Sequence, residues 1–259
     1  MHIKPKKRLG QNFLVDKNIQ RKIVEACAFQ PSDIILEIGA GRGELTKLIA
    51  EKAKAVFALE IDASLCDILK TRLKEYKNIK VIKQDILKFN FKGLPPGVQV
   101  LGNIPYYITT PILERLFKYR EKIKTIFISV QKEFAQRIIA PPGTKDYGAF
   151  SCFMQYYTDP KKLFYIKRTC FYPAPKVDSC FLHLAMREKP KVLAKNETLL
   201  FKIIRAAFNQ RRKILKNSLQ KVLPRRKIEF FLNHYSLNQN IRAEQLSLED
   251  FAHLADTIN

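Results

Sequence analysis

The stretch from residue 33 to residue 49 restricts the possible folds more than any other part of the sequence. Residues 33–38 form an apolar run typical of a buried strand, and Gly39, Gly41 and Gly43 follow it directly. The apolar residues after these glycines have helical spacing. A strand, a glycine-rich turn and a helix open a Rossmann-like unit, so the sequence predicts an α/β fold with a Rossmann-like sheet.

The glycine turn does not have the spacing of a dinucleotide-binding motif. It reads Gly-x-Gly-x-Gly rather than Gly-x-Gly-x-x-Gly, and no Walker lysine follows it. Its first two glycines allow the backbone to approach a ligand closely. Glu37, near the end of the strand, can contact the turn or a charged amino-acid part of that ligand. The turn alone is equally compatible with a purely structural role.

Two later strands each end in an acidic residue. The segment 55–60 ends in Glu60, and the segment 79–84 is followed by Asp85. An acid about twenty residues after the glycine turn is where nucleoside-binding folds accept ribose hydroxyls. A second acid can accept from the exocyclic amine of adenine. Each acid alone fits a solvated strand end, but the series fits S-adenosylmethionine better than NAD, because the turn lacks the dinucleotide spacing.

A second candidate site lies at residues 103–106, after the apolar strand 98–102. Open α/β sheets bind ligands at the carboxyl ends of their strands. Asn103 offers a side-chain carbonyl acceptor, Pro105 stiffens the turn and leaves its carbonyl as the polar group, and Tyr106 offers a flat ring for stacking. Asn-Ile-Pro-Tyr in this place resembles the signature of adenine-N6 methyltransferases. The structural alternative is a turn with a buried tyrosine.

These residues indicate how a poor nucleophile can be activated. The lone pair of the adenine amino nitrogen is delocalised into the ring, and we expect the side-chain carbonyl of Asn103 and the backbone carbonyl of Pro105 to accept its two N–H bonds. Tyr106 and Phe171, which belongs to a proline-braced loop, would hold the flipped base between them. Phe171 has an alternative role as a core anchor for that loop. No dedicated general base is evident.

The charge balance predicts a polyanionic partner. Lys and Arg number 47 against 24 acidic residues, which gives a formal net charge of +23. Nucleic acid fits this excess best. An anionic membrane surface is the alternative, although the sequence contains no long apolar span. A merely solvated basic surface is the third possibility.

The basic residues concentrate towards the carboxyl end. Between residues 187 and 227 there are fourteen Lys or Arg and two acidic residues, with apolar residues at helical spacing and a dense basic cluster at 210–213. We therefore expect a Rossmann-like domain over residues 1–186 and a small, basic, all-helical domain over residues 187–259. Residues 1–10 add a basic arm for phosphate contacts, or a frayed terminus.

Capping residues indicate where three helices begin. Asp16 is expected to cap a helix that follows the loop 11–14, which its Phe and Leu hold in place. A threonine before Pro111 is expected to cap a second helix with the proline at its first position. Ser247 is expected to cap the last helix.

The cysteines and histidines show no pattern of metal ligands. Five cysteines are scattered, and their odd number argues against a disulfide framework. We expect small buried thiols in a reducing compartment, and no metal site. The basic start of the chain is not followed by a signal-type apolar core, so a cytoplasmic location is expected.

Several stretches of the sequence form a recognisable set. They are residues 7–14, 37–43, 103–106 and 171–179. Together they resemble the small-subunit rRNA adenine dimethyltransferases, the KsgA or RsmA family, and the resemblance covers nearly the whole chain. The segment 205–213 is also similar to that family and separates it from the related macrolide-resistance methyltransferases. Ala40 stands where Pro is frequent in the family and Tyr107 where Asn or Gln is frequent, and the second difference bears on how the target base is held.

The resemblance implies S-adenosylmethionine-dependent dimethylation of two adjacent adenosines in the 3′-terminal hairpin loop of 16S rRNA. The substrate would be a late pre-30S particle rather than naked RNA, and the protein would act as a monomer. The residues that the family places at the cofactor correspond to Asn12, Leu14, Gly39, Glu60, Asp85 and Asn103.

Two other functions stay open from the sequence. One is methylation of large-subunit rRNA of the macrolide-resistance type, against which the helical C-terminal block argues. The other is a non-catalytic rRNA-binding assembly factor, against which the intact motif at 103–106 and Glu60 argue. An assembly role can also coexist with catalysis.

Overall fold

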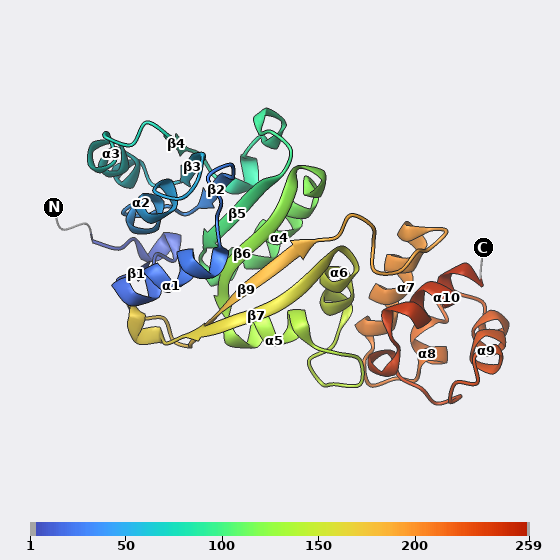
Figure 1. Cartoon of the computed structure of the whole chain (residues 1–259). Coiled ribbons are helices and arrows are strands. Elements are labelled where there is room, and N and C mark those ends of the chain that lie inside the picture. Colours follow the sequence, from blue (N-terminus) through green and yellow to red (C-terminus); the bar gives the residue numbers. More distant parts are fainter. Residues whose placement is uncertain (1–3, 258–259) are drawn as a thin grey trace. The chain divides into compact units, whose positions relative to one another are not determined.

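The computed structural model describes residues 4–257 and forms two compact units (Figure 1). The first unit comprises the chain up to residue 135 together with residues 161–186. The second comprises residues 136–160 and the chain from residue 187 onwards. The α/β Rossmann-like fold predicted from the sequence is confirmed. The start of the expected basic arm, residues 1–3, and the last two residues of the expected helical domain lie outside the described residues.

The first unit is built on a seven-stranded sheet in the order β4-β3-β2-β5-β6-β9-β7. The strands are β2 (Ile34–Ile38), β3 (Ala55–Glu60), β4 (Ile79–Lys83), β5 (Val98–Asn103), β6 (Ile123–Gln131), β7 (Thr158–Ile166) and β9 (Ser179–Met186). Strands β4, β3, β2, β5 and β6 run parallel, whereas β9 pairs with β6 in the antiparallel direction. The parallel strands place their carboxyl ends at one edge, so the polar residues that follow them gather there.

Apolar side chains on the central strands explain why the sheet forms. Every residue of β2 after Ile34 is buried, which is typical of a strand covered on both faces. Helices α2 (Glu44–Ala50) and α3 (Ala63–Arg72) lie beside β3 and β4, in blue and teal in Figure 1. The core on this side of the sheet includes Ile35, Ile49 and Leu101.

A short second sheet joins two distant parts of the chain. Strand β1 (Phe13–Leu14) pairs antiparallel with β8 (Phe171–Tyr172), and Leu14 lies opposite Phe171. The sequence predicted only a loop at residues 11–14. Helix α1 (Lys17–Cys27) follows, and the carboxylate of Asp16 accepts hydrogen bonds from the backbone of its first turn, as predicted.

The helix after the Asn103 motif begins earlier than predicted. Residues Tyr106–Ile108 form a 3₁₀ turn that leads directly into α4 (Thr109–Phe117). No threonine side chain caps α4, and Pro111 stands at its third position rather than its first. The prediction was wrong in this detail because a proline fits anywhere in the first turn, where the backbone N–H groups have no intrahelical acceptor.

The second unit is helical and has its own core. Its helices are α6 (Ala149–Tyr157), α7 (Glu197–Asn209), α8 (Leu215–Leu219), α9 (Arg225–His234) and α10 (Leu248–Asp256), while α5 (Lys132–Ile139) spans the boundary between the units. The side-chain oxygen of Ser247 accepts from the backbone N–H of Asp250 and caps α10, as predicted. Further 3₁₀ turns lie at Lys7–Leu9, Ile86–Lys88, Phe91–Gly93, Arg120–Lys122, Arg168–Cys170 and Ala243–Gln245.

The second unit takes in a segment that the sequence division placed in the first. Residues 136–160 pack with the chain from residue 187 onwards, because Tyr147, Cys152 and Tyr156 are buried in the same apolar cluster as α7. The proline pair that ends α5 breaks the helix, and the aromatic-rich helix α6 then supplies these side chains. The last segment of the first unit ends at residue 186.

Candidate active site

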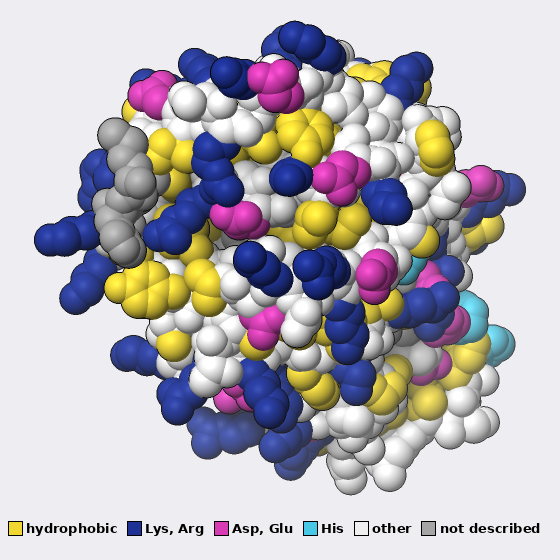
Figure 2. Space-filling view, turned by 60° about the vertical axis from the view of Figure 1, so that its left-hand side comes forward, with side chains coloured by type: hydrophobic (Ala, Val, Ile, Leu, Met, Phe, Trp, Pro, Cys, Tyr) yellow, Lys and Arg dark blue, Asp and Glu magenta, His cyan; other side chains and the backbone are white. Residues whose placement is uncertain are grey.

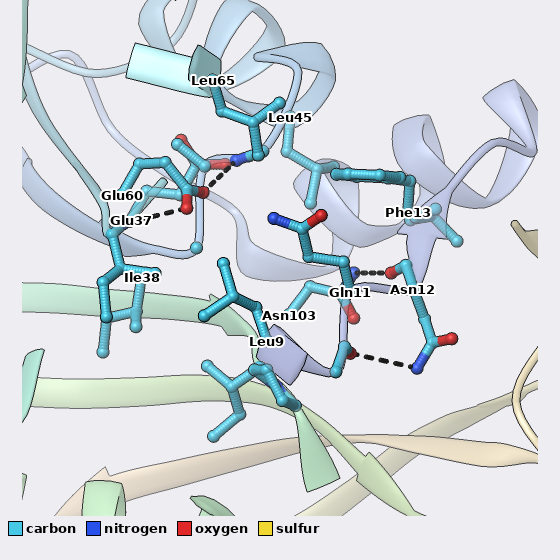
Figure 3. A pocket seen from close by; sticks show the side chains of 18 of the residues that line it. Leu9, Gln11, Asn12, Phe13, Glu37, Ile38, Leu45, Glu60, Leu65 and Asn103 are labelled. Carbon is cyan, nitrogen blue, oxygen red and sulfur yellow. Dashed lines mark hydrogen bonds between the residues drawn. The ribbon is translucent and has the colours of Figure 1, made fainter. Parts of the chain in front are cut away.

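A pocket opens at the carboxyl edge of the parallel sheet, between the strand ends and the N-terminal segment. Every residue that the sequence analysis placed at the cofactor or at the target base lines it. These residues are Asn12, Leu14, Gly39, Glu60, Asp85, Asn103, Pro105, Tyr106 and Phe171. Figure 3 shows Glu37 and Glu60 on one side of the cavity and Gln11, Asn12 and Asn103 across from them. The fold therefore brings together residues that are up to 159 positions apart, and their individual roles stay predictions.

Glu60 holds the glycine turn in place. Its Oε2 accepts the backbone N–H of Gly41 at 2.9 Å, and its Oε1 accepts the N–H groups of Ile61 and Asp62 at 2.9 Å each. Gly41 has φ +57°, a conformation that favours glycine. Burial raises the pKa of Glu60, and the three backbone hydrogen bonds oppose that rise. A carboxylate has about four acceptor positions, so one position on Oε2 is left for a ligand.

One carboxylate oxygen of Asp85 stabilises the fold, and the other is available to a ligand. Its Oδ1 accepts the N–H of Leu87 at 2.9 Å and caps the 3₁₀ turn that follows β4. The residue also lines the pocket. Its second oxygen makes no hydrogen bond within the described residues, which leaves an acceptor for an exocyclic amine.

Glu37 is the most unusual charge at the site. It is 3% exposed, lines the pocket, and its Oε2 has no hydrogen-bond partner within the described residues. Burial raises the pKa of Glu37 to about 7. Thr46 opposes this rise, and the neighbouring charge of Glu60 adds to it as a lesser cause. A buried carboxylate oxygen without a partner is costly when ionised, so Oε2 is a natural place for a cationic ligand group.

The pKa of Glu37 predicts a pH-dependent stability. The carboxyl binds its proton more tightly in the folded than in the unfolded chain, so its contribution to stability is lost as pH rises from about 5 to about 8. The Glu37→Gln variant cannot ionise. Its free energy of unfolding relative to the wild type should increase across this pH range by on the order of 3 kcal/mol. Urea unfolding at a series of pH values measures this difference, and a pH-independent difference would contradict the assignment.

The side chain of Asn103 is oriented by the N-terminal segment. Its Nδ2 donates to the backbone carbonyl of Asn12 at 3.5 Å, and the Nδ2 of Asn12 donates to the carbonyl of Gly10 at 3.3 Å. With its nitrogen held in this way, Asn103 has its side-chain oxygen available as an acceptor. The carbonyl of Pro105 accepts the N–H of Ile108 at 3.2 Å and keeps a second lone pair.

The two aromatic residues expected to hold a base differ in their settings. Tyr106 is half-buried, and its hydroxyl is hydrogen-bonded to the hydroxyl of Ser179. Burial raises the pKa of Tyr106, so the phenol stays protonated at neutral pH. Phe171 is 3% exposed and packs with Leu14 in the core. Phe171 therefore anchors its loop, as the structural alternative held, and also lines the pocket.

The N-terminal segment forms a wall of the pocket through contacts that the sequence analysis missed. The Nζ of Lys6 pairs with Oδ1 of Asp62 at 2.6 Å, and Nε2 of Gln11 donates to Oδ2 of the same carboxylate at 3.1 Å. Asp62 is buried, and its pKa is lowered, because these donors outweigh the opposing effect of burial. Leu9 and Gln11 line the pocket. The stretch 7–14 was part of the family resemblance, but nothing in it indicated the partner Asp62.

The charge on the molecular surface agrees with a polyanionic partner. Lys and Arg predominate among the charged side chains on the face shown in Figure 2.

Within residues 4–257 there is no cluster of three or more His, Cys, Asp or Glu that could hold a metal ion. No described helix has both the length and the apolar character needed to cross a bilayer. All five cysteines are unpaired; four are buried and Cys170 is half-buried.

Comparison with known proteins gives relatives whose names agree with one another. A family model described as "Ribosomal RNA adenine dimethylase" matches residues 2–259. "Ribosomal RNA small subunit methyltransferase A" of Clostridium acetobutylicum is 44% identical over 256 residues, which cover 97% of this chain and 93% of the relative. The protein of the same name from Geobacillus sp. is 41% identical over 266 residues, covering 98% and 91%.

Two solved structures are similar over nearly the whole chain. A dimethyladenosine transferase from Plasmodium falciparum matches with a TM-score of 0.82 and 27% identity, covering 93% of this chain and 95% of its own. The 23S rRNA methyltransferase ErmE matches with a TM-score of 0.77 and 27% identity, covering 95% and 99%. The fold is thus shared by a protein named as a dimethyladenosine transferase and by one named as a 23S rRNA methyltransferase.

Proposed function

The chain belongs to the ribosomal RNA adenine dimethylase family, and on that basis we propose that it dimethylates N6 of adenosines in small-subunit rRNA. The target is two adjacent adenosines in the 3′-terminal hairpin loop of 16S rRNA. The observation that carries the proposal is the pocket in which the cofactor-type residues of β2, β3 and β4 meet the Asn103–Tyr106 motif after β5. The names of the relatives support the small subunit.

The residues of the pocket fit S-adenosylmethionine as the donor. The glycine turn leaves room for close approach, Glu60 keeps an acceptor position for a ribose hydroxyl, and Asp85 keeps one for an adenine amine. The unpartnered Oε2 of Glu37 suits the ammonium group of an amino-acid moiety. When bound, this donor supplies an electrophilic methyl group on a sulfonium.

Asn103 and Pro105 prepare the nucleophile. The side-chain oxygen of Asn103 and the free lone pair of the Pro105 carbonyl accept the two N–H bonds of the adenine amine, which returns electron density to the nitrogen and directs its lone pair at the methyl carbon. The donor would supply the methyl carbon to this nitrogen, its carbon–sulfur bonding pair would stay with sulfur, and one proton of the amine would pass to water. Tyr106 and Phe171 hold the base by stacking.

Labelled-methyl transfer to purified subunits tests the function. Undermethylated 30S subunits should accept up to four methyl groups, two on each of two neighbouring adenosines, and mapping of the modified nucleotides should place them in the 3′-terminal hairpin. Isolated 50S subunits are the comparison, because the similarity to ErmE makes large-subunit methylation the second candidate. Transfer to 50S and not to 30S would refute the proposal.

The basic second unit is proposed to hold the rRNA, and its arginines divide into two roles. Arg211 donates from its guanidinium to the backbone carbonyls of Lys145 at 2.7 Å and Tyr147 at 3.0 Å, so it fixes the loop before α6. Arg212 is exposed and makes no hydrogen bond or ion pair within the described residues. Arg212 is therefore the better candidate for a phosphate contact.

The two arginines should respond differently to substitution. The Arg212→Ala variant should bind 30S subunits more weakly and reduce the slope of log affinity against log salt by about 1, with an unchanged melting temperature. The Arg211→Ala variant should lose about 0.5–1.5 kcal/mol of stability, because two carbonyls at a largely exposed place lose their donor. Binding at several salt concentrations and thermal unfolding measure both effects. Normal binding by Arg212→Ala at all salt concentrations would contradict the proposed contact.

The setting of the reaction follows the same proposal. The substrate is a late pre-30S particle in the cytoplasm, and the enzyme acts on it as a monomer. Sedimentation of the protein alone and with pre-30S particles tests the stoichiometry.

A further inference from the structure

Tyr107 is a large aromatic residue at the pocket that the proposed chemistry does not use. It is 64% exposed and lines the same pocket as its neighbour Tyr106, which is half-buried. Among the described residues that line this pocket, the other exposed large apolar side chains are the aliphatic Val15 and Ile61. Two consecutive tyrosines thus differ: one is hydrogen-bonded within the fold through Ser179, and the other presents its ring to solvent at the pocket.

The ring of Tyr107 is restricted along one edge by Gly10. A Cβ atom on Gly10 would lie 2.8 Å from Cε1 of Tyr107, 3.1 Å from its Cδ1 and 3.0 Å from the Cβ of Pro105. Gly10 has φ +59°, so this position favours glycine both by conformation and by space. One edge of the ring therefore packs against the N-terminal segment while most of its surface stays open. A ring restricted by such a contact can stack at a lower entropic cost than a freely rotating one.

We propose that Tyr107 is the stacking platform for the nucleotide next to the adenosine that enters the pocket. The inference rests on the proposed function. A flipped nucleotide stays covalently linked to its neighbours, so those neighbours are held near the pocket opening after losing one of their stacking partners. An exposed aromatic ring beside the base-holding Tyr106 replaces that partner, and stacking on it is tolerant of base identity.

Stacking on Tyr107 favours a substrate whose two target bases are adjacent. While one adenosine occupies the pocket, its neighbour stacks on Tyr107, and the same ring serves again when the two exchange places. The contribution depends on the ring rather than on the phenolic hydroxyl. Tyr107 is therefore a positioning residue that acts on the substrate outside the reacting base.

A double-mutant cycle, in which the protein and the RNA are changed separately and together, tests the contact between Tyr107 and the neighbouring base. The substrates are 30S particles reconstituted with a 16S rRNA whose 3′ segment is a ligated synthetic oligonucleotide, either intact or with one neighbour of the target adenosine made abasic. Single-turnover methylation is measured at saturating S-adenosylmethionine. On the intact particle, Tyr107→Ala should be slower by about fivefold to a hundredfold, which corresponds to about 1–3 kcal/mol. Tyr107→Phe should keep the wild-type rate.

The decisive readout is the coupling between the two changes. When the stacked base is absent, the wild type should slow to the rate of Tyr107→Ala, and the variant should lose nothing further. Tyr165→Ala is the matched control, because Tyr165 is an exposed tyrosine of the first unit that does not line the pocket. Direct titration of S-adenosylmethionine into Tyr107→Ala should show an unchanged affinity, which separates base stacking from a disturbed Gly10 contact.

The outcomes separate the inference from the function on which it rests. The rate losses caused by Tyr107→Ala and by an abasic site could instead multiply independently. If they did so with either neighbour of the target adenosine made abasic, the proposed stacking on Tyr107 would be refuted. A Tyr107→Phe variant as slow as Tyr107→Ala would overturn it as well. A wild-type protein that does not methylate the intact particle would overturn the proposed function and this inference together.

Discussion

Replacing Asn103 with alanine is expected to slow methyl transfer by about 10²–10³-fold while leaving the affinity for 30S subunits unchanged. The variant loses the acceptor for one N–H of the adenine amine, an interaction that matters most as charge develops on the nitrogen, and the loss of one such preorganised group has effects of this size. The hydrogen bond from Asn103 to the carbonyl of Asn12 is long, at 3.5 Å, so its removal should disturb the N-terminal segment little.

Single-turnover transfer of labelled methyl groups and equilibrium binding to 30S subunits measure the two quantities for Asn103→Ala. Asn217→Ala is a suitable control, because this asparagine is exposed on α8 and its side chain makes no hydrogen bond within the described residues. Rate and RNA affinity that fall in parallel would refute a catalytic role for Asn103.

The Glu60→Gln variant should bind S-adenosylmethionine about 100-fold more weakly. Glutamine keeps the size of the side chain, but its NH₂ group would face at least one of the backbone N–H donors that the carboxylate now accepts. Each charged hydrogen bond lost in a buried place costs about 1.5–3 kcal/mol, and the glycine turn would lose its anchor at Gly41. The substitution therefore weakens the glycine turn and also removes the carboxylate that is proposed to accept a ribose hydroxyl.

Calorimetric titration of the donor measures the affinity of Glu60→Gln, and the exposed Glu25 of α1 provides the control variant Glu25→Gln. Because the defect lies in cofactor binding, the rate at a saturating donor concentration should recover more than the rate at a low one. An unchanged affinity for the donor, measured on a folded variant, would show that Glu60 supports neither the turn nor the ligand.

The elements that the sequence predicted correctly are those with local signals. The apolar runs that became β2, β3 and β5 are long enough to mark buried strands. The functional residue ends the strand in β3 (Glu60) and β5 (Asn103), and it follows directly in β2 (Gly39). The carboxyl edge of a parallel sheet then places Glu60 and Asn103 at one pocket without further information. The cap at Asp16 was equally local.

The contacts that the sequence did not predict span long separations or depend on a few residues. The pairing of Leu14 with Phe171 involves strands of two residues each, which are too short for any periodicity. Lys6 forms an ion pair with Asp62. In a sequence with so many lysines, charge alone does not indicate which of them pairs with this aspartate. Arg211 belongs to the basic cluster at 210–213, and only the structure shows that its guanidinium donates to two backbone carbonyls of its own chain.

The link between β1 and β8 also bears on the order in which the protein is made. Residues 13–14 leave the translating ribosome early, but their partners at 171–172 are added only after about two thirds of the chain. A nascent chain that already holds the glycine turn and Glu60 still lacks Phe171, which lines the same pocket. The lining of the pocket is therefore complete only when the chain has returned to its own beginning.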